Sequence, residues 1–335
     1  MDNITEIINH LEKETAYNHI VKDIKKIITG VSIVFLTGNL VYKFNKPLNL
    51  GFLDFSTLEK RKIQCEKEIR YNSLITPELY LGVSTINKNS IGQISVDGEG
   101  EIIDYAVRMN QVNPDSTMDN LLVKNLVSEN KIKDLAKKIF EFHKVALCNE
   151  EISKFGSFEC VKFNWDENFS QTNGYIGDLI SQEDFNLIKD KINHFIIINR
   201  ELFEKRVKEN KIKHCHGDFH SGNVFLDSGK IIIFDGIVFN QRFPCSDIIA
   251  EIAFMSMDLD FHNRKELSSI FINEYKLLSN DKDIDKLLNF YKCYRAYIRA
   301  KIACFTYDDD NLSIEEKEKE TKKAKQYFEL AKKSA

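Results

Sequence analysis

Two carboxylates and one carboxamide follow one another along a short segment of this chain, in an order that suits phosphate chemistry. Residues 214–236 read His-Cys-His-Gly-Asp-Phe-His-Ser-Gly-Asn-Val-Phe-Leu-Asp-Ser-Gly-Lys-Ile-Ile-Ile-Phe-Asp-Gly, with Asp218 five residues before Asn223 and Asp235 near the end. The turn sequence Asp227-Ser228-Gly229 separates two apolar runs, which predicts a β-hairpin that would make Asn223 and Asp235 neighbours. Oxygen ligands of this kind suit a hard cation such as Mg²⁺ that carries the phosphates of a nucleotide. The segment therefore predicts a phosphoryl-transfer site.

The same order of groups, a base, an amide five residues later, a hairpin and a metal carboxylate, is that of the protein-kinase catalytic loop. Here the loop begins His216-Gly217-Asp218, without the arginine that protein kinases usually carry before the aspartate. The segment therefore resembles the aminoglycoside phosphotransferase and choline kinase branch, the small-molecule kinases of this fold. The resemblance implies that Asp218 is the catalytic base and that Asn223 and Asp235 are the Mg²⁺ ligands.

Other side chains in the segment have simpler interpretations. We expect His216 to be a buried structural histidine that holds the loop, and His220 to be similar but more able to face a cleft. Cys215 is expected in the core. Asp227 lies in the turn of the hairpin and favours a turn conformation there.

The overall composition is that of an ordinary soluble globular protein. The 335 residues are 43% hydrophobic and 29% charged, with a net charge of −4, so nothing in the total charge indicates nucleic acid or membrane as a partner. No apolar stretch approaches the roughly 18–20 residues that span a bilayer, and no secretory signal is recognisable at the N-terminus. The seven cysteines lack Cys-x-x-Cys spacing, which is typical of reduced thiols in a cytoplasmic protein. The sequence leaves the oligomeric state open.

The chain changes from strand-rich to helical near residues 110–116. Apolar spacing predicts one or two helices over 4–28. The capping-box sequence Ser56-Thr57-Leu58-Glu59 predicts a helix that runs to about residue 73. Strands are expected at Val31–Leu36, Leu40–Lys46, Leu79–Val83, Ile91–Val96 and Ile102–Met109, and helices at 117–127, 129–148, 182–209, 245–259, 264–279, 283–304 and 313–333.

These elements and the motif together predict an α+β, bilobal protein-kinase-like fold of the aminoglycoside phosphotransferase and choline kinase type. Residues 1–112 would form a small N-terminal lobe of leading helices, antiparallel sheet and one main helix. Residues 113–335 would form a larger helical lobe that contains the catalytic loop, 214–236.

A lysine on the second predicted strand is a candidate for binding the nucleotide. Strand alternation places Val41, Lys43 and Asn45 on one face. Val-x-Lys matches the kinase strand in which a small apolar residue covers the adenine and the lysine pairs with the phosphates. We expect Lys43 to be held by Glu68, or else by Glu66, on the helix that follows. The alternative is that Lys43 is an ordinary lysine facing solvent.

The glycine pattern excludes one class of nucleotide site. The turn Thr37-Gly38-Asn39 has a single glycine, and neither Gly-x-Gly-x-x-Gly nor a P-loop motif occurs in the chain. Small-molecule kinases of this fold often lack the full glycine motif. In the segment that ends the last predicted strand, the resemblance places Met109 behind the adenine, with the main chain of Asn110 and Val112 at its edge.

A narrower resemblance extends over roughly residues 30–330. Several segments together resemble a bacterial family of aminoglycoside-phosphotransferase-like proteins of unknown substrate, some of which carry a further P-loop kinase domain. These segments are Tyr42-Lys43-x-x-Lys46-Pro47, Gly51-Phe52-Leu53-Asp54-Phe55-Ser56-Thr57-Leu58-Glu59-Lys60-Arg61, Cys65-x-x-Glu68-Ile69-Arg70-x-Asn72, Tyr80-Leu81, Tyr105-Ala106-Val107-Arg108-Met109, Phe234-Asp235-x-Ile237-x-Phe239-Asn240 and Met257-Asp258-Leu259.

Two positions depart from that family. It usually has Asp-Leu-Ala on the helix after the metal aspartate, where this chain has Glu251-Ile252-Ala253. If that carboxylate braces the catalytic loop, an extra methylene must be accommodated, and Asp247 could share the role. The family usually has a glutamate where this chain has Val238, which puts one substrate or metal contact in doubt.

A basic, aromatic stretch indicates the class of acceptor. Arg295 and Arg299 are four apart and would share one face of a helix, next to Tyr291 and Tyr294. Arginine forks suit carboxylate or phosphate, so these two residues favour an anionic or sugar-like substrate. The alternative is a solvated helix face.

The sequence therefore predicts an ATP- and Mg²⁺-dependent phosphotransferase that acts on a hydroxyl of a small metabolite, with GTP as a possible donor. One alternative is a kinase or nucleotidyltransferase acting on a protein, against which the missing arginine and activation segment count. Another is a nucleotide-sensing pseudokinase, against which the complete set of Lys43, Asp218, Asn223 and Asp235 counts.

Overall fold

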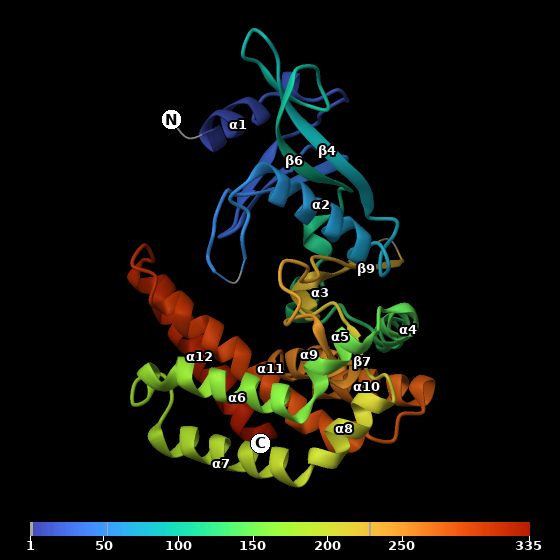
Figure 1. Ribbon diagram of the computed structural model, residues 1–335, viewed down its shortest axis with the longest axis vertical. Coiled ribbons are helices and arrows are strands. Elements are labelled where there is room, and N and C mark those ends of the chain that lie inside the picture. The colour runs from blue at the N-terminus through green and yellow to red at the C-terminus, as the bar shows by residue number, and fades with distance from the viewer. Residues whose placement is uncertain (1–2, 52, 228) are drawn as a thin grey trace. The chain divides into compact units, whose positions relative to one another are not determined.

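The computed structural model describes residues 3–51, 53–227 and 229–335 (Figure 1). Phe52 and Ser228, which belong to the motifs above, lie outside the described residues. The chain divides into two compact units. The first holds the chain up to residue 116 together with 225–241, and the second holds 117–224 and 242–335.

The first unit is built on an antiparallel sheet with the strand order β1-β2-β3-β6-β4-β5. All five strands that the sequence predicts are present, and β2 and β3 are joined by the expected turn, in which Gly38 has a φ of 96°. The alternation of β3 is also as predicted, because Tyr42 and Phe44 are buried in one apolar cluster and Val41 in another. The strands are β1 (Lys25–Ile28), β2 (Ser32–Leu36), β3 (Leu40–Asn45), β4 (Tyr80–Lys88), β5 (Ile94–Val96) and β6 (Glu101–Asn110).

The N-terminal segment differs from its prediction. Helix α1 spans Asn3–Leu11, but 25–28 form strand β1 rather than the end of a second helix. All four residues of β1 are exposed, and its backbone pairs with β2, with Ile27 opposite Val34. The isoleucine spacing at 20, 24 and 27 therefore imitates a helix, while pairing with a neighbouring strand decides the conformation.

Helix α2 (Leu58–Asn72) begins one residue later than the capping box predicts. Its N-cap is Thr57, whose hydroxyl accepts the N–H of Lys60 at 3.3 Å. Ser56 instead donates its hydroxyl to Asp54 at 2.6 Å. The shift does not change which residues face the sheet, and Cys65 and Glu68 are both buried.

The hairpin after the catalytic loop is present as strands β8 (Val224–Asp227) and β9 (Lys230–Ile233). Hydrogen bonds attach the end of β9 to the first unit. The Thr76 hydroxyl donates to the carbonyl of Ile233 at 2.9 Å and accepts its N–H at 3.1 Å. The N–H of Gly236 donates to the Asn72 side chain at 2.9 Å. These bonds explain why 225–241 belong to the first unit, although we expected the whole segment 214–236 in the second lobe.

The second unit is helical, with one short antiparallel ladder between β7 (Ile212–His214) and β10 (Cys245–Asp247). The predicted helix 182–209 is divided at Asn199, and the first residues of the predicted helix 245–259 form β10. Helix α6 was not predicted. The helices are α3 (Met118–Val123), α4 (Glu129–Val145), α5 (Glu150–Ser153), α6 (Phe158–Thr172), α7 (Gln182–Ile198), α8 (Arg200–Lys208), α9 (Ile248–Phe261), α10 (Lys265–Ser279), α11 (Ile284–Tyr307) and α12 (Ile314–Ser334). Over the described residues, none of the helices is both long and apolar enough to cross a bilayer.

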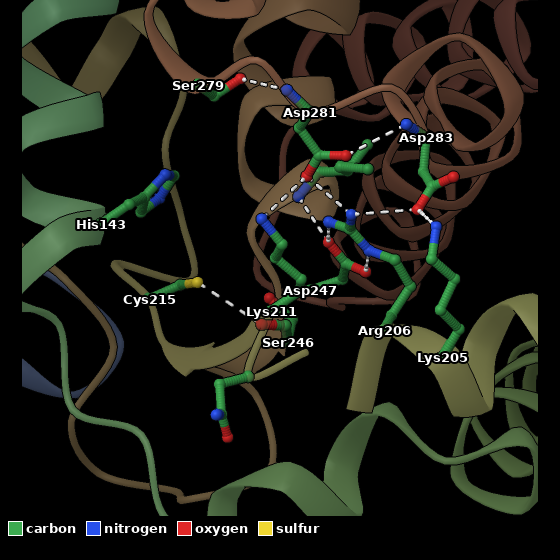
Figure 2. Close-up of polar contacts among 12 residues, drawn as sticks. His143, Lys205, Arg206, Lys211, Cys215, Ser246, Asp247, Ser279, Asp281 and Asp283 are labelled. Carbon is green, nitrogen blue, oxygen red and sulfur yellow. Dashed lines mark hydrogen bonds and ion pairs between the residues drawn. The ribbon is translucent and has the colours of Figure 1, made fainter. Parts of the chain in front are cut away.

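Helix α9 is the centre of this unit, since every residue from Ile248 to Leu259 is buried. A buried ion network holds Asp247, the N-cap residue just before this helix (Figure 2). Arg206 on α8 is fully buried and binds both carboxylate oxygens of Asp247 at 2.7 Å, while its third nitrogen binds Asp281 at 2.6 Å. Asp247 in turn accepts the N–H of Ile249 at 2.8 Å and so caps α9. One arginine therefore joins the start of α9 to the turn before α11.

Candidate functional site

In the first unit, Lys43, Glu68 and Asp235 come together. Lys43 Nζ lies 3.0 Å from Glu68 Oε1 and 2.5 Å from Asp235 Oδ1. Only 4% of the Glu68 side chain is exposed, whereas Glu66, the alternative partner, faces solvent. The ion pair that the sequence predicts between β3 and α2 is therefore present, and its carboxylate is that of Glu68. Burial opposes the charged form of Lys43, but Asp235 and Glu68 outweigh it and raise the pKa of the ammonium above its ordinary value.

Asp235 has an unusual backbone conformation. Its φ is 63°, in the left-handed region that few non-glycine residues adopt. The Tyr80 hydroxyl accepts its N–H at 3.1 Å. Half of the Asp235 side chain (51%) is exposed, so a carboxylate paired with Lys43 on one side remains open to a ligand on the other. A strained backbone held by surrounding hydrogen bonds is common where a side chain must be aimed at a ligand.

The residues expected at the adenine edge follow directly from β6. The N–H of Asn110 donates to the carbonyl of Leu79 at 2.9 Å, so sheet pairing already uses that donor. Gln111 ties this segment to the β2–β3 turn, since its N–H donates to the carbonyl of Asn39 and its side chain accepts the N–H of Gly38. Among the described residues, no hydrogen bond involves the N–H of Val112. Within the described part of the chain, the main-chain donor of Val112 thus remains unused.

In the second unit, the catalytic loop holds Asp218 in a fixed setting. Asn223 donates its Nδ2 to the carbonyl of Asp218 at 3.0 Å and to Oδ2 of the same residue at 2.9 Å. The N–H of Asp218 donates to Nδ1 of His216 at 3.3 Å. His216 is 2% exposed, which confirms the prediction of a buried histidine that holds the loop. Over the described residues, nothing bonds to Oδ1 of Asn223 or to Oδ1 of Asp218, and 35% of the Asp218 side chain is exposed.

His220 lies beside Asp218 and contributes to its charge state. Its Nδ1 accepts the N–H of Gly222 at 3.1 Å, and its Nε2 lies 3.4 Å from Oδ2 of Asp218. Arg299 lies close by, with Nη1 at 3.3 Å from the same Nε2. Burial opposes ionisation of Asp218, but His220 and Arg299 outweigh it, so the pKa of the carboxyl lies well below its usual range. Asp218 is held as a carboxylate.

The two arginines expected to face a substrate differ in their surroundings. Arg299 is partly exposed and lies beside Asp218 and His220. Arg295 is 5% exposed, and its Nη1 donates to the carbonyl of Gly217 at 3.0 Å. The helical spacing places both on one side of α11, but Arg295 is buried against the loop backbone, whereas Arg299 is partly exposed and lies over the ring of Tyr327.

Other expectations concern residues around the site. Cys215 is buried as expected, and its thiol donates to the carbonyl of Ser246 at 3.6 Å. Val238, where the resembling family has glutamate, is 8% exposed, so an apolar side chain fills a buried position there. Glu251 accepts two backbone N–H groups of the catalytic loop, as a bracing carboxylate should, whereas Asp247 binds Arg206.

Solved structures of small-molecule kinases share this fold across the whole chain. A choline/ethanolamine kinase family protein from Mesorhizobium loti matches with a TM-score of 0.55, covering 100% of this chain and 99% of the other at 9% identity. A choline kinase from Cryptosporidium parvum Iowa II matches with a TM-score of 0.56, covering 99% and 96% at 11% identity. The amicoumacin kinase hAmiN, in complex with AMP-PNP, Ca²⁺ and Ami, matches with a TM-score of 0.54, covering 98% and 94% at 12% identity.

The chain has the choline kinase type of protein-kinase-like fold. This confirms the fold class that the catalytic-loop motif predicts. No protein-family model matches the chain. Its curated relatives are uncharacterized proteins of Mycobacterium bovis and Mycobacterium tuberculosis, 28% identical over 279 residues, or 83% of this chain and 54% of theirs. The chain thus spans about half the length of the curated relatives that it matches.

Proposed function

We propose that this protein is a phosphotransferase that moves the γ-phosphoryl group of ATP to a hydroxyl of a small metabolite. The observation that carries the proposal is the setting of Asp218, a carboxylate kept ionised and fixed through one oxygen while the other stays open. The fold supports it, because proteins named choline kinase and amicoumacin kinase share it over the full chain. GTP is an alternative donor that the same groups would accept.

The open oxygen of Asp218 gives the reaction its base. Asn223 and His220 both bind Oδ2, so Oδ1 is the atom that an acceptor hydroxyl meets. The acceptor oxygen forms its bond to the γ-phosphorus as the bond from that phosphorus to the bridging oxygen of the leaving ADP breaks. Asp218 takes the hydroxyl proton. A carboxylate of low pKa is a weak base, so its main contribution is to orient the hydroxyl and to accept the proton late.

The remaining groups hold the donor nucleotide. Lys43, fixed by Glu68, binds the phosphates, and the N–H of Val112 meets the base. Asn110 can contribute only its main-chain carbonyl there, because its N–H is bonded within the sheet. Asn223 through its open Oδ1 and Asp235 through its exposed carboxylate offer the hard oxygen ligands that suit Mg²⁺. The metal, when bound, neutralises charge on the phosphate oxygens.

The acceptor class rests on Arg299. Its guanidinium lies beside Asp218, where an acceptor must place its hydroxyl, so an anionic or hydroxyl-rich acceptor such as an acidic sugar is favoured. Arg295 no longer supports this assignment, because its donors bind backbone carbonyls.

Thermal shift with ATP, GTP and ADP, each with and without Mg²⁺, tests the donor site. A ligand at 100 times its Kd stabilises the folded state by about 2.7 kcal/mol, which a melting curve resolves readily. We expect a shift that depends on Mg²⁺. Asp218→Ala should keep that shift and abolish transfer, whereas Asp235→Ala should lose the Mg²⁺-dependent part. Full transfer by Asp218→Ala would refute the catalytic assignment, and a shift without transfer to any sugar acid, sugar phosphate, amino alcohol or protein would favour a nucleotide sensor.

A further inference from the structure

Helix α9 fixes the catalytic loop at two points with two buried carboxylates. Glu251 accepts the N–H of His216 at 2.9 Å and the N–H of Gly217 at 2.8 Å. Asp258 accepts the N–H of Ser221 at 2.8 Å. The two acids are seven residues apart, about two helical turns, and therefore lie on one face of α9. The backbone on both sides of Asp218 is thus tied to a single buried helix.

Arg295 on α11 binds the same loop at Gly217, the residue whose N–H binds Glu251. Its Nη1 donates to the carbonyl of Gly217 at 3.0 Å, and its Nε donates to the carbonyl of Ala250 at 3.2 Å. The guanidinium also lies 4.8 Å above the ring of Phe254. Gly217 is therefore held at its N–H by Glu251 and at its C=O by Arg295. Its φ is 83°, in the left-handed region that favours glycine, and these two contacts hold the peptide of the residue before Asp218 in that conformation.

Behind Glu251 stands a further pair of buried groups. His143 Nε2 lies 3.2 Å from Glu251 Oε2, and the Tyr275 hydroxyl lies 2.7 Å from His143 Nδ1. Burial opposes ionisation of Glu251, but hydrogen bonding to His143 and the loop lowers the pKa of its carboxyl to about 2. An ionised carboxylate can only accept, so His143 donates to Glu251 at Nε2.

A metal does not fit this group. His143, Cys215 and Glu251 have potential ligand atoms within 4.8 Å of one another. Both ring nitrogens of His143 and both oxygens of Glu251 are already hydrogen-bonded, however, so a metal would have to break the contacts that hold the loop.

We propose that Arg295 is a positioning residue for catalysis, which it serves by fixing the Gly217 peptide and with it the direction of the Asp218 side chain. The proposal rests on the proposed function. It assigns to Arg295 a role different from substrate binding, although it lies only one helical turn from Arg299. Rotation of the peptide between 217 and 218 would swing the carboxylate without disturbing the nucleotide groups in the first unit. A displacement of about 1 Å at a reacting group can cost about 100-fold in rate.

The test compares Arg295→Met, Arg295→Lys and Lys292→Met. Methionine keeps the apolar stem over Phe254, and lysine keeps the charge but cannot reach both carbonyls. Lys292 is a matched control, since it also joins α11 to α9, through Asp260, without touching the loop. We expect kcat to fall about 10- to 100-fold in Arg295→Met, with KM for ATP unchanged within about twofold, partial recovery in Arg295→Lys and wild-type kcat in Lys292→Met.

Two readouts separate this proposal from the proposed function. Amide hydrogen exchange over 214–223 requires no acceptor, and it should be faster in Arg295→Met but not in Lys292→Met. Slow ATP hydrolysis reports kcat without an acceptor. If the wild-type protein neither hydrolyses ATP nor transfers phosphate, the proposed function fails, while the exchange rates still decide whether Arg295 holds the loop. Unchanged exchange in Arg295→Met, unchanged kcat, or a rise in KM for the acceptor alone would overturn the assignment.

Discussion

Removal of the buried arginine in Figure 2 should destabilise the second unit severely. Arg206→Met replaces a fully buried cation that binds Asp247 through two bonds of 2.7 Å and Asp281 through one of 2.6 Å. Methionine fills much of the volume but leaves the buried Asp247 carboxylate without its cation, and among the described residues Asp281 keeps only Lys211, at 3.6 Å. Breaking a buried pair in this way costs about 3–5 kcal/mol. For a unit of about 200 residues, each kcal/mol lowers Tm by about 2–4 °C, so a decrease of roughly 6–20 °C is expected.

Differential scanning calorimetry at pH 7 measures this change, and Arg200→Met provides the control. Arg200 binds Glu159 at 2.9 Å on the neighbouring surface of the same helical region, with 59% and 66% of the two side chains exposed. An exposed pair contributes about 0–1 kcal/mol, so Arg200→Met should melt within a few degrees of the wild type. A decrease in Tm that is equally small in Arg206→Met would refute the reasoning.

The difference in Tm between the wild type and Arg206→Met should depend on pH with a definite sign. Burial raises the pKa of Asp281, but Arg206 outweighs it and lowers that pKa below its ordinary value. The ion pair therefore contributes its stability above the unfolded-state pKa of Asp281, near 4, and loses it as the pH falls below that range. In Arg206→Met this contribution is already absent, and protonation of Asp281 lessens the cost of burying its carboxylate. The gap in Tm should thus be widest near pH 7 and narrow towards pH 4, and a constant gap would show that the cost lies in packing instead.

Two further perturbations test Lys43 and the setting of Asp218 separately. Lys43→Met should abolish the Mg²⁺–ATP thermal shift and also lower Tm, because it leaves Glu68 buried without a cation. The control is Lys46→Met, at the residue that follows β3, whose side chain binds the carbonyl of Thr29; it should have neither effect. Gly222→Ala would place its Cβ 2.9 Å from the ring of His220 and displace the imidazole, so the pKa of Asp218 should rise and the acidic limb of the pH–rate profile should move to higher pH. A profile that superimposes on that of the wild type would contradict the role of His220.

Local signals account for what the sequence predicts well. Strand alternation places Val41 and Lys43 on one face of the sheet, and the helix that follows offers Glu68 as the expected partner, with Glu66 left open until the structure shows Glu68 buried and paired. The loop motif fixes Asp218 and Asn223 by spacing alone, and their hydrogen bonds follow because five residues of tight loop bring the amide back to the aspartate. Each of these inferences needs only the chain within one element and its neighbour.

Prediction fails where partners distant in sequence decide the outcome. Residues 25–28 become a strand because β2 offers a free edge, which no periodicity in the segment reveals. Helix α6 mixes aromatic and amide residues with helix formers such as Glu159 and Lys162, and it packs against α11 through Trp165 and Tyr297. Arg295 and Arg299 carry identical local signals. Only the contact with the catalytic-loop backbone distinguishes Arg295, which is buried and bonded to Gly217, from Arg299, which is partly exposed.

The same reasoning explains why the groups that position the base are harder to find than the base itself. Asp218 must be open, so its type and spacing remain visible in the sequence. Glu251 and Arg295 act from inside the core, where a charged residue is tolerated only because every polar atom has a partner. A more distant residue also holds the helices that carry them. Helix α9 carries Glu251 and helix α11 carries Arg295, and Arg206 joins the start of α9 to the turn before α11. Stability of the helical unit and the geometry of its catalytic loop therefore depend on one connected set of buried charges.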